Sequence, residues 1–96
     1  MIIKLKKFGS TLTSRDDGKE AVAAFKSSLN DVSRQEIVEV DFSGVNTFTP
    51  SWGDEFLTPL FELFNDKLNL INTDNYSVQA TLKLLEKIQD IKFNIR

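Results

Sequence analysis

The residues of this chain that could do chemistry lie between positions 38 and 56. A strand rich in β-branched residues ends at Asp41, and a short loop leads to Ser51, which opens an amphipathic helix. The first turn of that helix carries Asp54 and Glu55. A serine at a helix N-terminus can carry a phosphate, because free backbone N–H groups and the helix dipole favour an anion there. Ser51 is therefore our candidate phosphoacceptor.

The same four residues also have purely structural interpretations. Ser51 can cap the helix, with Asp54 completing a capping box. Asp54 and Glu55 suit the positive end of the helix dipole, or they contact a basic patch on a partner. Asp41 is expected to accept backbone hydrogen bonds in the turn that follows it. If Asp41, Asp54 and Glu55 converged they could hold Mg²⁺, which leaves a metal-dependent hydrolase as an alternative, although their spacing matches no recognised metal motif.

The rest of the composition offers little chemistry. The chain has no His and no Cys, so it lacks the commonest acid–base residue, a thiolate metal site and disulfides. We therefore expect no enzyme activity, no catalytic residue, no metal and no cofactor. Twelve Lys and Arg stand against fourteen Asp and Glu, a net charge of −2, which does not suggest nucleic-acid binding. An antitoxin-like partner of a small operon remains an alternative, acting on a protein.

The length of 96 residues predicts one domain spanning positions 1–96. No run approaches the ~18 consecutive apolar residues of a membrane span, and the N-terminus does not resemble a signal peptide. We therefore expect a cytoplasmic protein without membrane association. A strand at the C-terminus could pair with a second copy, but Lys92 and its short length oppose this, so we expect a monomer or weak dimer.

Hydrophobic periodicity predicts strands that alternate with helices. The expected strands are residues 2–6, a very short one within 8–13, and 37–42, 68–72 and 91–95. The expected helices are 14–30, capped by Ser14, one starting at Ser51, and one whose buried face holds Val78, Leu82, Leu85 and Ile88. Thr58-Pro59 kinks or restarts the second helix. This order predicts an α/β fold with a mainly parallel sheet, a strand at 37–42 covered on both faces, and an antiparallel contribution near the N-terminus.

The segment Asp41-Phe42-Ser43-Gly44-Val45 resembles the strand-to-loop pattern of STAS domains, the module of anti-sigma-factor antagonists. In those antagonists the pattern continues to Asp-Ser-Ser-Gly, whose second serine is phosphorylated by a partner kinase, and Ser51 falls at that serine. Thr49 and Pro50 replace the acidic residue and the first serine, and Trp52 replaces the glycine.

A closer resemblance is to a STAS-like bacterial family of uncharacterised function. It is carried by four segments in order: Thr13-Ser14-Arg15, Asp41 to Val45, Ser51-Trp52-Gly53-Asp54-Glu55, and Asn72-Thr73-Asp74-Asn75.

The resemblance implies a STAS-like domain with a mostly parallel sheet of four to five strands and about three helices. It also implies a regulatory module that binds a signalling protein, such as a histidine-kinase-like ATPase or serine kinase. Besides Ser51, the expected partner-binding residues are Arg15, Thr49, Trp52, Asp54 and Glu55. Arg15 would bind an anion or pair with Glu55. Trp52 would belong to the core if buried, and would anchor an interface if exposed.

Overall fold

Four parallel strands form the main sheet in the order β1-β3-β5-β6, in a computed structural model that describes all residues from 1 to 96. Its strands are β1 (Ile2–Lys4), β3 (Val38–Asp41), β5 (Leu68–Ile71) and β6 (Asn94–Ile95). A second sheet contains β2 (Thr11–Leu12) and β4 (Thr47–Phe48). The α-helices are α1 (Arg15–Leu29), α2 (Pro50–Phe64) and α3 (Tyr76–Gln89), with 3-10 turns η1 (Leu5–Phe8) and η2 (Asn65–Lys67). The predicted α/β class is confirmed.

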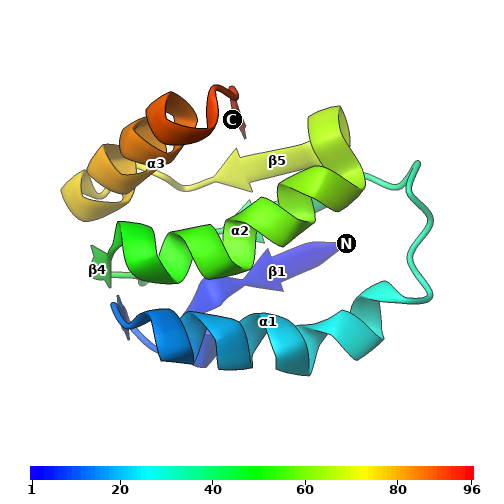
Figure 1. Ribbon diagram of the computed structural model, residues 1–96, viewed down its shortest axis with the longest axis horizontal. Coiled ribbons are helices and arrows are strands. Elements are labelled where there is room, and N and C mark those ends of the chain that lie inside the picture. The colour runs from blue at the N-terminus through cyan, green and yellow to red at the C-terminus, as the bar shows by residue number, and fades with distance from the viewer.

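All three α-helices lie on one face of the main sheet (Figure 1). The reason is the strand order: each right-handed crossover moves one position in the same direction, so each helix returns on the same side. Val38 and Val40 point into this helical layer and are fully buried, whereas Glu39 and Asp41 point to the other face and are only half-buried. The prediction that this strand is covered on both faces was therefore wrong.

Helix α2 is the centre of the helical layer and lies between α1 and α3 (Figure 1). Its buried residues include one large apolar side chain from each successive turn, namely Trp52, Phe56, Leu60 and Phe64. Pro59 lies inside the helix, which runs unbroken from Pro50 to Phe64. The sequence had suggested a kink or a restart at Thr58-Pro59, and the helix does not restart there.

A close approach between α1 and α2 explains the glycine in the first helix. A Cβ atom on Gly18 would lie 2.9 Å from the Trp52 carbonyl oxygen and 3.1 Å from the Glu55 Cβ. Gly18 therefore permits the two helices to touch at their N-terminal ends, at the cost of helix propensity. Ser14 caps α1 as predicted, because its Oγ accepts a hydrogen bond from the Asp17 N–H at 3.0 Å.

The short β2 and β4 strands correct the predicted topology near the N-terminus. β1 pairs in parallel with β3, and β2 pairs in parallel with β4, so the expected antiparallel pairing does not occur. The strand β4 was not predicted, because two residues are too few to show periodicity. The predicted strand at 91–95 contracts to Asn94–Ile95.

Candidate functional site

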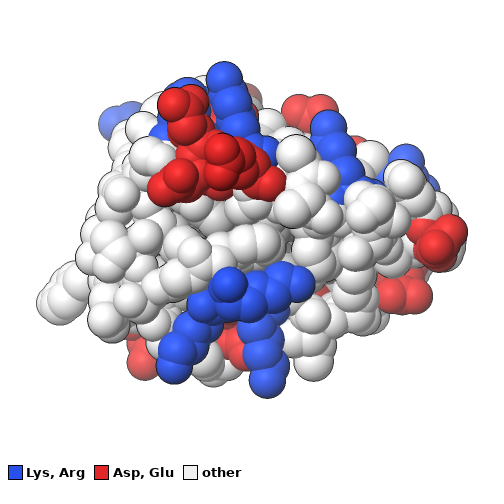
Figure 2. Space-filling view, turned by 90° about the horizontal axis from the view of Figure 1, so that it is seen from below, with Lys and Arg blue, Asp and Glu red and all other residues white.

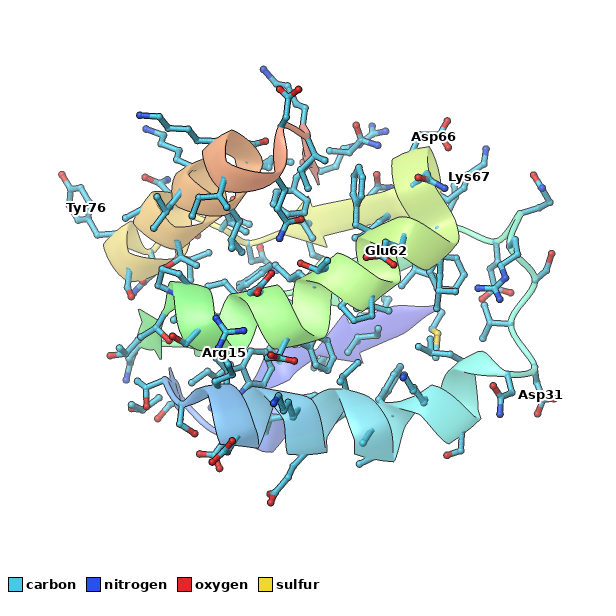
Figure 3. All side chains as sticks on the ribbon, in the orientation of Figure 1. Arg15, Asp31, Glu62, Asp66, Lys67 and Tyr76 are labelled. Atoms are coloured by element: carbon cyan, nitrogen blue, oxygen red, sulfur yellow. The ribbon has the colours of Figure 1, made fainter.

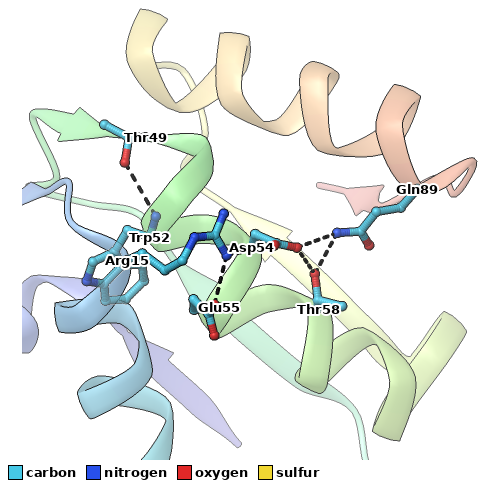
Figure 4. Close-up of polar contacts among 7 residues, drawn as sticks. All are labelled: Arg15, Thr49, Trp52, Asp54, Glu55, Thr58 and Gln89. Atoms are coloured by element: carbon cyan, nitrogen blue, oxygen red, sulfur yellow. Dashed lines mark hydrogen bonds and ion pairs between the residues drawn. The ribbon is translucent and has the colours of Figure 1, made fainter.

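The N-terminus of α2 is capped by Thr49, not by Ser51. Thr49 has an extended backbone, and its Oγ1 accepts a hydrogen bond from the Trp52 N–H at 3.4 Å (Figure 4). The same hydroxyl donates to the Thr13 carbonyl oxygen at 2.6 Å, which ties the cap to the loop before α1. Pro50 is the first helical residue, a position that proline favours. The predicted Ser51–Asp54 capping box was therefore wrong.

Ser51 is the second residue of α2, and its hydroxyl makes no hydrogen bond within the protein. The residue is half-buried. Only one buried side-chain polar atom in the chain lacks a hydrogen-bond partner, and it is Oδ1 of Asn69. The unpaired Ser51 Oγ must therefore be accessible to solvent. Capping therefore does not explain the serine at this position.

Arg15 joins the start of α1 to the first turn of α2. Its Nη1 donates to Glu55 Oε1 at 2.8 Å and to Asp54 Oδ2 at 3.1 Å. Figure 3 shows the Arg15 side chain reaching from α1 towards α2. The hydrogen bonds to Glu55 and then to Asp54 raise the pKa of Arg15 above its usual value. Of the alternatives left open for Arg15, the pair with Glu55 is the one that forms, and one cation here faces two carboxylates.

The second carboxylate oxygen of Asp54 faces α3. Asp54 Oδ1 accepts hydrogen bonds from Thr58 Oγ1 at 2.9 Å and from Gln89 Nε2 at 2.8 Å (Figure 4). Gln89 Nε2 also lies 2.7 Å from Thr58 Oγ1. Asp54 thus links all three helices through Arg15 and Gln89. The Thr58 contact follows helical spacing and could have been inferred from sequence, but nothing in the sequence pointed to Gln89.

Trp52 belongs to the core. Its side chain is 1% exposed and stacks on Phe56, with ring centroids 5.0 Å apart. Phe48 and Phe8 contact it at centroid distances of 5.9 and 6.0 Å. This burial corrects the prediction that Trp52 contacts a partner directly. Thr49, another predicted contact, is half-buried and is occupied as the helix cap.

Asp41 shapes the turn after β3, as predicted. Its Oδ1 accepts hydrogen bonds from Asn72 Nδ2 at 2.8 Å and from the Ser43 N–H at 2.9 Å. These two bonds hold the pKa of Asp41 below its ordinary value, and the bond from Asn72 has the larger effect. The chain contains no group of three or more acidic residues placed to hold a metal ion. Asp41, Asp54 and Glu55 therefore do not converge on a common metal position.

An apolar surface on α3 lies beside the start of α2. Ile88 is 66% exposed and Leu84, one turn earlier, is 41% exposed. Ile88 lines a hollow of about 220 Å³ together with Arg15, Pro50, Asp54, Leu85 and Gln89. The sequence had placed Ile88 on the buried face of this helix, which was wrong. Leu84 does not share the helical spacing of the predicted buried residues Leu82 and Leu85. An apolar residue at such a position was the sequence signal for an exposed apolar surface.

One family model matches the central part of the chain. The family model described as a STAS-like domain of unknown function (DUF4325) matches residues 20–78, more than half of the chain. The chain belongs to this family. The matched STAS-like region includes Asp41, Ser51, Asp54 and Glu55, and excludes Arg15 and most of α3.

Searches among curated proteins and among solved structures gave no match. None of the helices has the length and apolar content needed to span a bilayer.

Proposed function

We propose that this STAS-like chain is a regulatory protein-interaction module that acts by binding rather than by catalysis. Its partner surface comprises the first turn of α2 and the adjoining outer face of α3. The observation that supports this most directly is the Ser51 hydroxyl, which is solvent-accessible, unbonded and without a capping role. The exposed side chains of Leu84 and Ile88 supply the apolar area that the centre of a protein interface needs.

The partner that we propose is an ATPase or serine kinase of the histidine-kinase-like class. Support comes from the resemblance of the segment around Asp41 and Ser51 to anti-sigma-factor antagonists, in which a serine at the corresponding place is phosphorylated. A kinase needs an accessible hydroxyl, and Ser51 offers one at the edge of the proposed surface.

Phosphorylation of Ser51 would change the local charge strongly. A phosphoserine carries a charge of about −1.5 to −2 at neutral pH. Asp54 and Glu55 follow by one helical turn, on the same side of α2, and Arg15 is the cation paired with them. The phosphate would therefore compete for Arg15 and would repel an acidic partner surface.

The helix N-terminus itself gives such a phosphate little compensation. The Trp52 N–H donates to Thr49 Oγ1 and the Gly53 N–H donates to the Thr49 carbonyl oxygen. Pro50 has no N–H, which leaves only that of Ser51 unpaired. The added charge would consequently remain exposed to a partner, and this favours phosphorylation as a signal that releases the complex.

Affinity capture from lysate of the native host, read by mass spectrometry, tests the proposal. We expect wild type to retain a partner that Ser51→Asp and Ile88→Asp both lose. Ser27→Asp is the matched control, because Ser27 is an exposed serine near the C-terminal end of α1 and lies outside the proposed surface. A partner retained equally by all four proteins would refute this surface. Incubation of the purified pair with ATP then tests whether phosphate appears on Ser51.

A further inference from the structure

The short β2 strand has one open edge. The Thr47 N–H donates to the Ser10 carbonyl oxygen and the Thr49 N–H donates to that of Leu12, so these groups of β2 face β4. In a parallel ladder the residue between them points its N–H and C=O the other way. Thr11 is that residue, it is exposed, and no other strand pairs with this side of β2.

The equivalent edge of β4 is closed, which makes the open edge of β2 distinctive. The Phe48 N–H donates to Ser77 Oγ at 2.8 Å, and the Phe48 carbonyl oxygen accepts from Ser77 and Thr81 of α3. Side chains of a helix thus satisfy the polar groups on one side of this two-stranded sheet. On the other side, the N–H and C=O of Thr11 remain available to an extended chain.

A groove of about 450 Å³ runs between this edge and α1. Its floor is apolar and comprises Phe8, Leu12 and Trp52. Residues 17, 20, 21 and 24 of α1 form its wall, at the spacing of one helical face. The alanines in this wall have small side chains, and that leaves space for apolar side chains of another molecule.

Charge is distributed unequally across the groove. Asp17 and Glu20 line it, are exposed, and form no ion pair within the protein. Beyond the floor, Lys7 places its Nζ 5.4 Å from the ring centroid of Phe8 and 4.5 Å from that of Phe25. Figure 2, seen from the side of α1, shows a group of acidic and a group of basic side chains separated by an uncharged band.

From these features we infer that the groove binds an extended peptide segment of a partner protein, as an added strand on β2. The peptide pairs its backbone with the N–H and C=O of Thr11, inserts an apolar side chain over Phe8 and Leu12, and directs a Lys or Arg towards Asp17 and Glu20. An edge strand supplies affinity through main-chain bonds, and pockets for alternate side chains supply specificity. This site is separate from the Ser51 surface and does not depend on it.

The test is selection of a phage-displayed library of random decapeptides against the whole chain. We expect the selected peptides to place Lys or Arg near an apolar residue. In ¹H–¹⁵N spectra, a selected synthetic peptide should shift the amide of Thr11 and slow its hydrogen exchange. N-methylation of the peptide residue that pairs with Thr11 should weaken binding by about tenfold or more, because its N–H is lost.

Two alanines of α1 provide matched variants. Ala24→Phe fills the groove and should weaken binding by about tenfold or more, because an apolar side chain can no longer enter. Ala23→Phe places the same ring on an exposed neighbour outside the groove and should leave binding unchanged. Glu20→Lys reverses the rim charge and should weaken binding by about threefold to tenfold, which gives a second readout if Ala24→Phe does not fold.

The inference is overturned if the library yields no peptide above background. It is equally overturned if the selected peptides bind Ala24→Phe as tightly as Ala23→Phe. If Ala24→Phe does not fold, Glu20→Lys takes its place in this comparison. Binding that resists N-methylation at every peptide position would also overturn it, since strand addition requires the main-chain bonds.

Discussion

Replacement of Thr49 by Val separates the structural role of Thr49 from the proposed role of Ser51. Valine keeps the β-branched shape that suits the extended backbone of Thr49 and removes only the hydroxyl. Two hydrogen bonds are then lost, the one accepted from the Trp52 N–H and the one donated to the Thr13 carbonyl oxygen. Ser51→Ala removes a hydroxyl that makes no hydrogen bond within the protein.

The expected magnitudes follow from the geometry of the bonds. The capping bond is long, at 3.4 Å, so its loss belongs at the low end of the range for helix caps, about 0.5 kcal/mol. The bond to Thr13 is short, at 2.6 Å, and its net contribution is about 1 kcal/mol. Thr49→Val should therefore lower the free energy of unfolding by about 1.5 kcal/mol, or the Tm by about 6–12 °C for a domain of this size. Ser51→Ala should stay within about 0.5 kcal/mol of wild type, on the stabilising side, because alanine is the better helix former.

Thermal melting by circular dichroism and urea unfolding measure both variants against wild type. Equal urea slopes would show that the denatured state is unchanged, so that the midpoints report stability. A loss of stability in Ser51→Ala equal to or larger than that in Thr49→Val would refute the assignment of the cap. Ser51 would then have a structural role, and its variants could not be used as clean probes of partner binding.

Three further predictions concern the packing and the pH dependence of the fold. Gly18→Ala should destabilise by about 1–2 kcal/mol in urea unfolding, although alanine normally improves a helix by about 1 kcal/mol, because its Cβ meets the Trp52 carbonyl oxygen at 2.9 Å. Pro59→Ala should stabilise the fold by about 1–2 kcal/mol in thermal melts, because the restored helical N–H outweighs the entropy that the unfolded chain gains; a lower Tm would contradict this. The lowered pKa of Asp41 means that its ionised form stabilises the fold above the unfolded pKa of about 4 and that this contribution is lost as pH falls through the folded pKa. Wild type should therefore exceed Asp41→Asn in stability at neutral pH, and the difference should shrink below about pH 4 when both are unfolded in urea across pH; a difference independent of pH would contradict the role given to its hydrogen bonds with Asn72 and Ser43.

Features that depend on neighbouring residues in the chain could be predicted from the sequence. The Ser14 cap and the turn at Asp41 are hydrogen bonds that span two or three residues, so side-chain type and local spacing are sufficient to indicate them. The cap of α2 was also a local feature, and its signal was present. Thr49 precedes Pro50, and a proline at the first helical position indicates that the residue before it is the cap.

Features that depend on residues distant in the chain could not be predicted in detail. Ile88 was assigned to the core because it continues the spacing of Leu82 and Leu85, yet it is exposed at the rim of the hollow beside Pro50 and Asp54. Trp52 was left open between core and interface, since a large apolar residue in the first turn of a helix fits either role. Its contacts with Phe8 of η1 and Phe48 of β4 show that Trp52 belongs to the core.

The sequence by itself determined the alternation of the main-sheet strands with three helices, the α/β class and the STAS-like family, because periodicity, caps and short motifs are local properties. Tertiary structure alone decided which groups meet and which stay open. Gln89 reaches Asp54 across 35 positions, and the open edge of Thr11 exists because β2 pairs with β4 and not with β1. Both outcomes depend on how the helices and the two sheets pack against one another, and local spacing does not encode that arrangement.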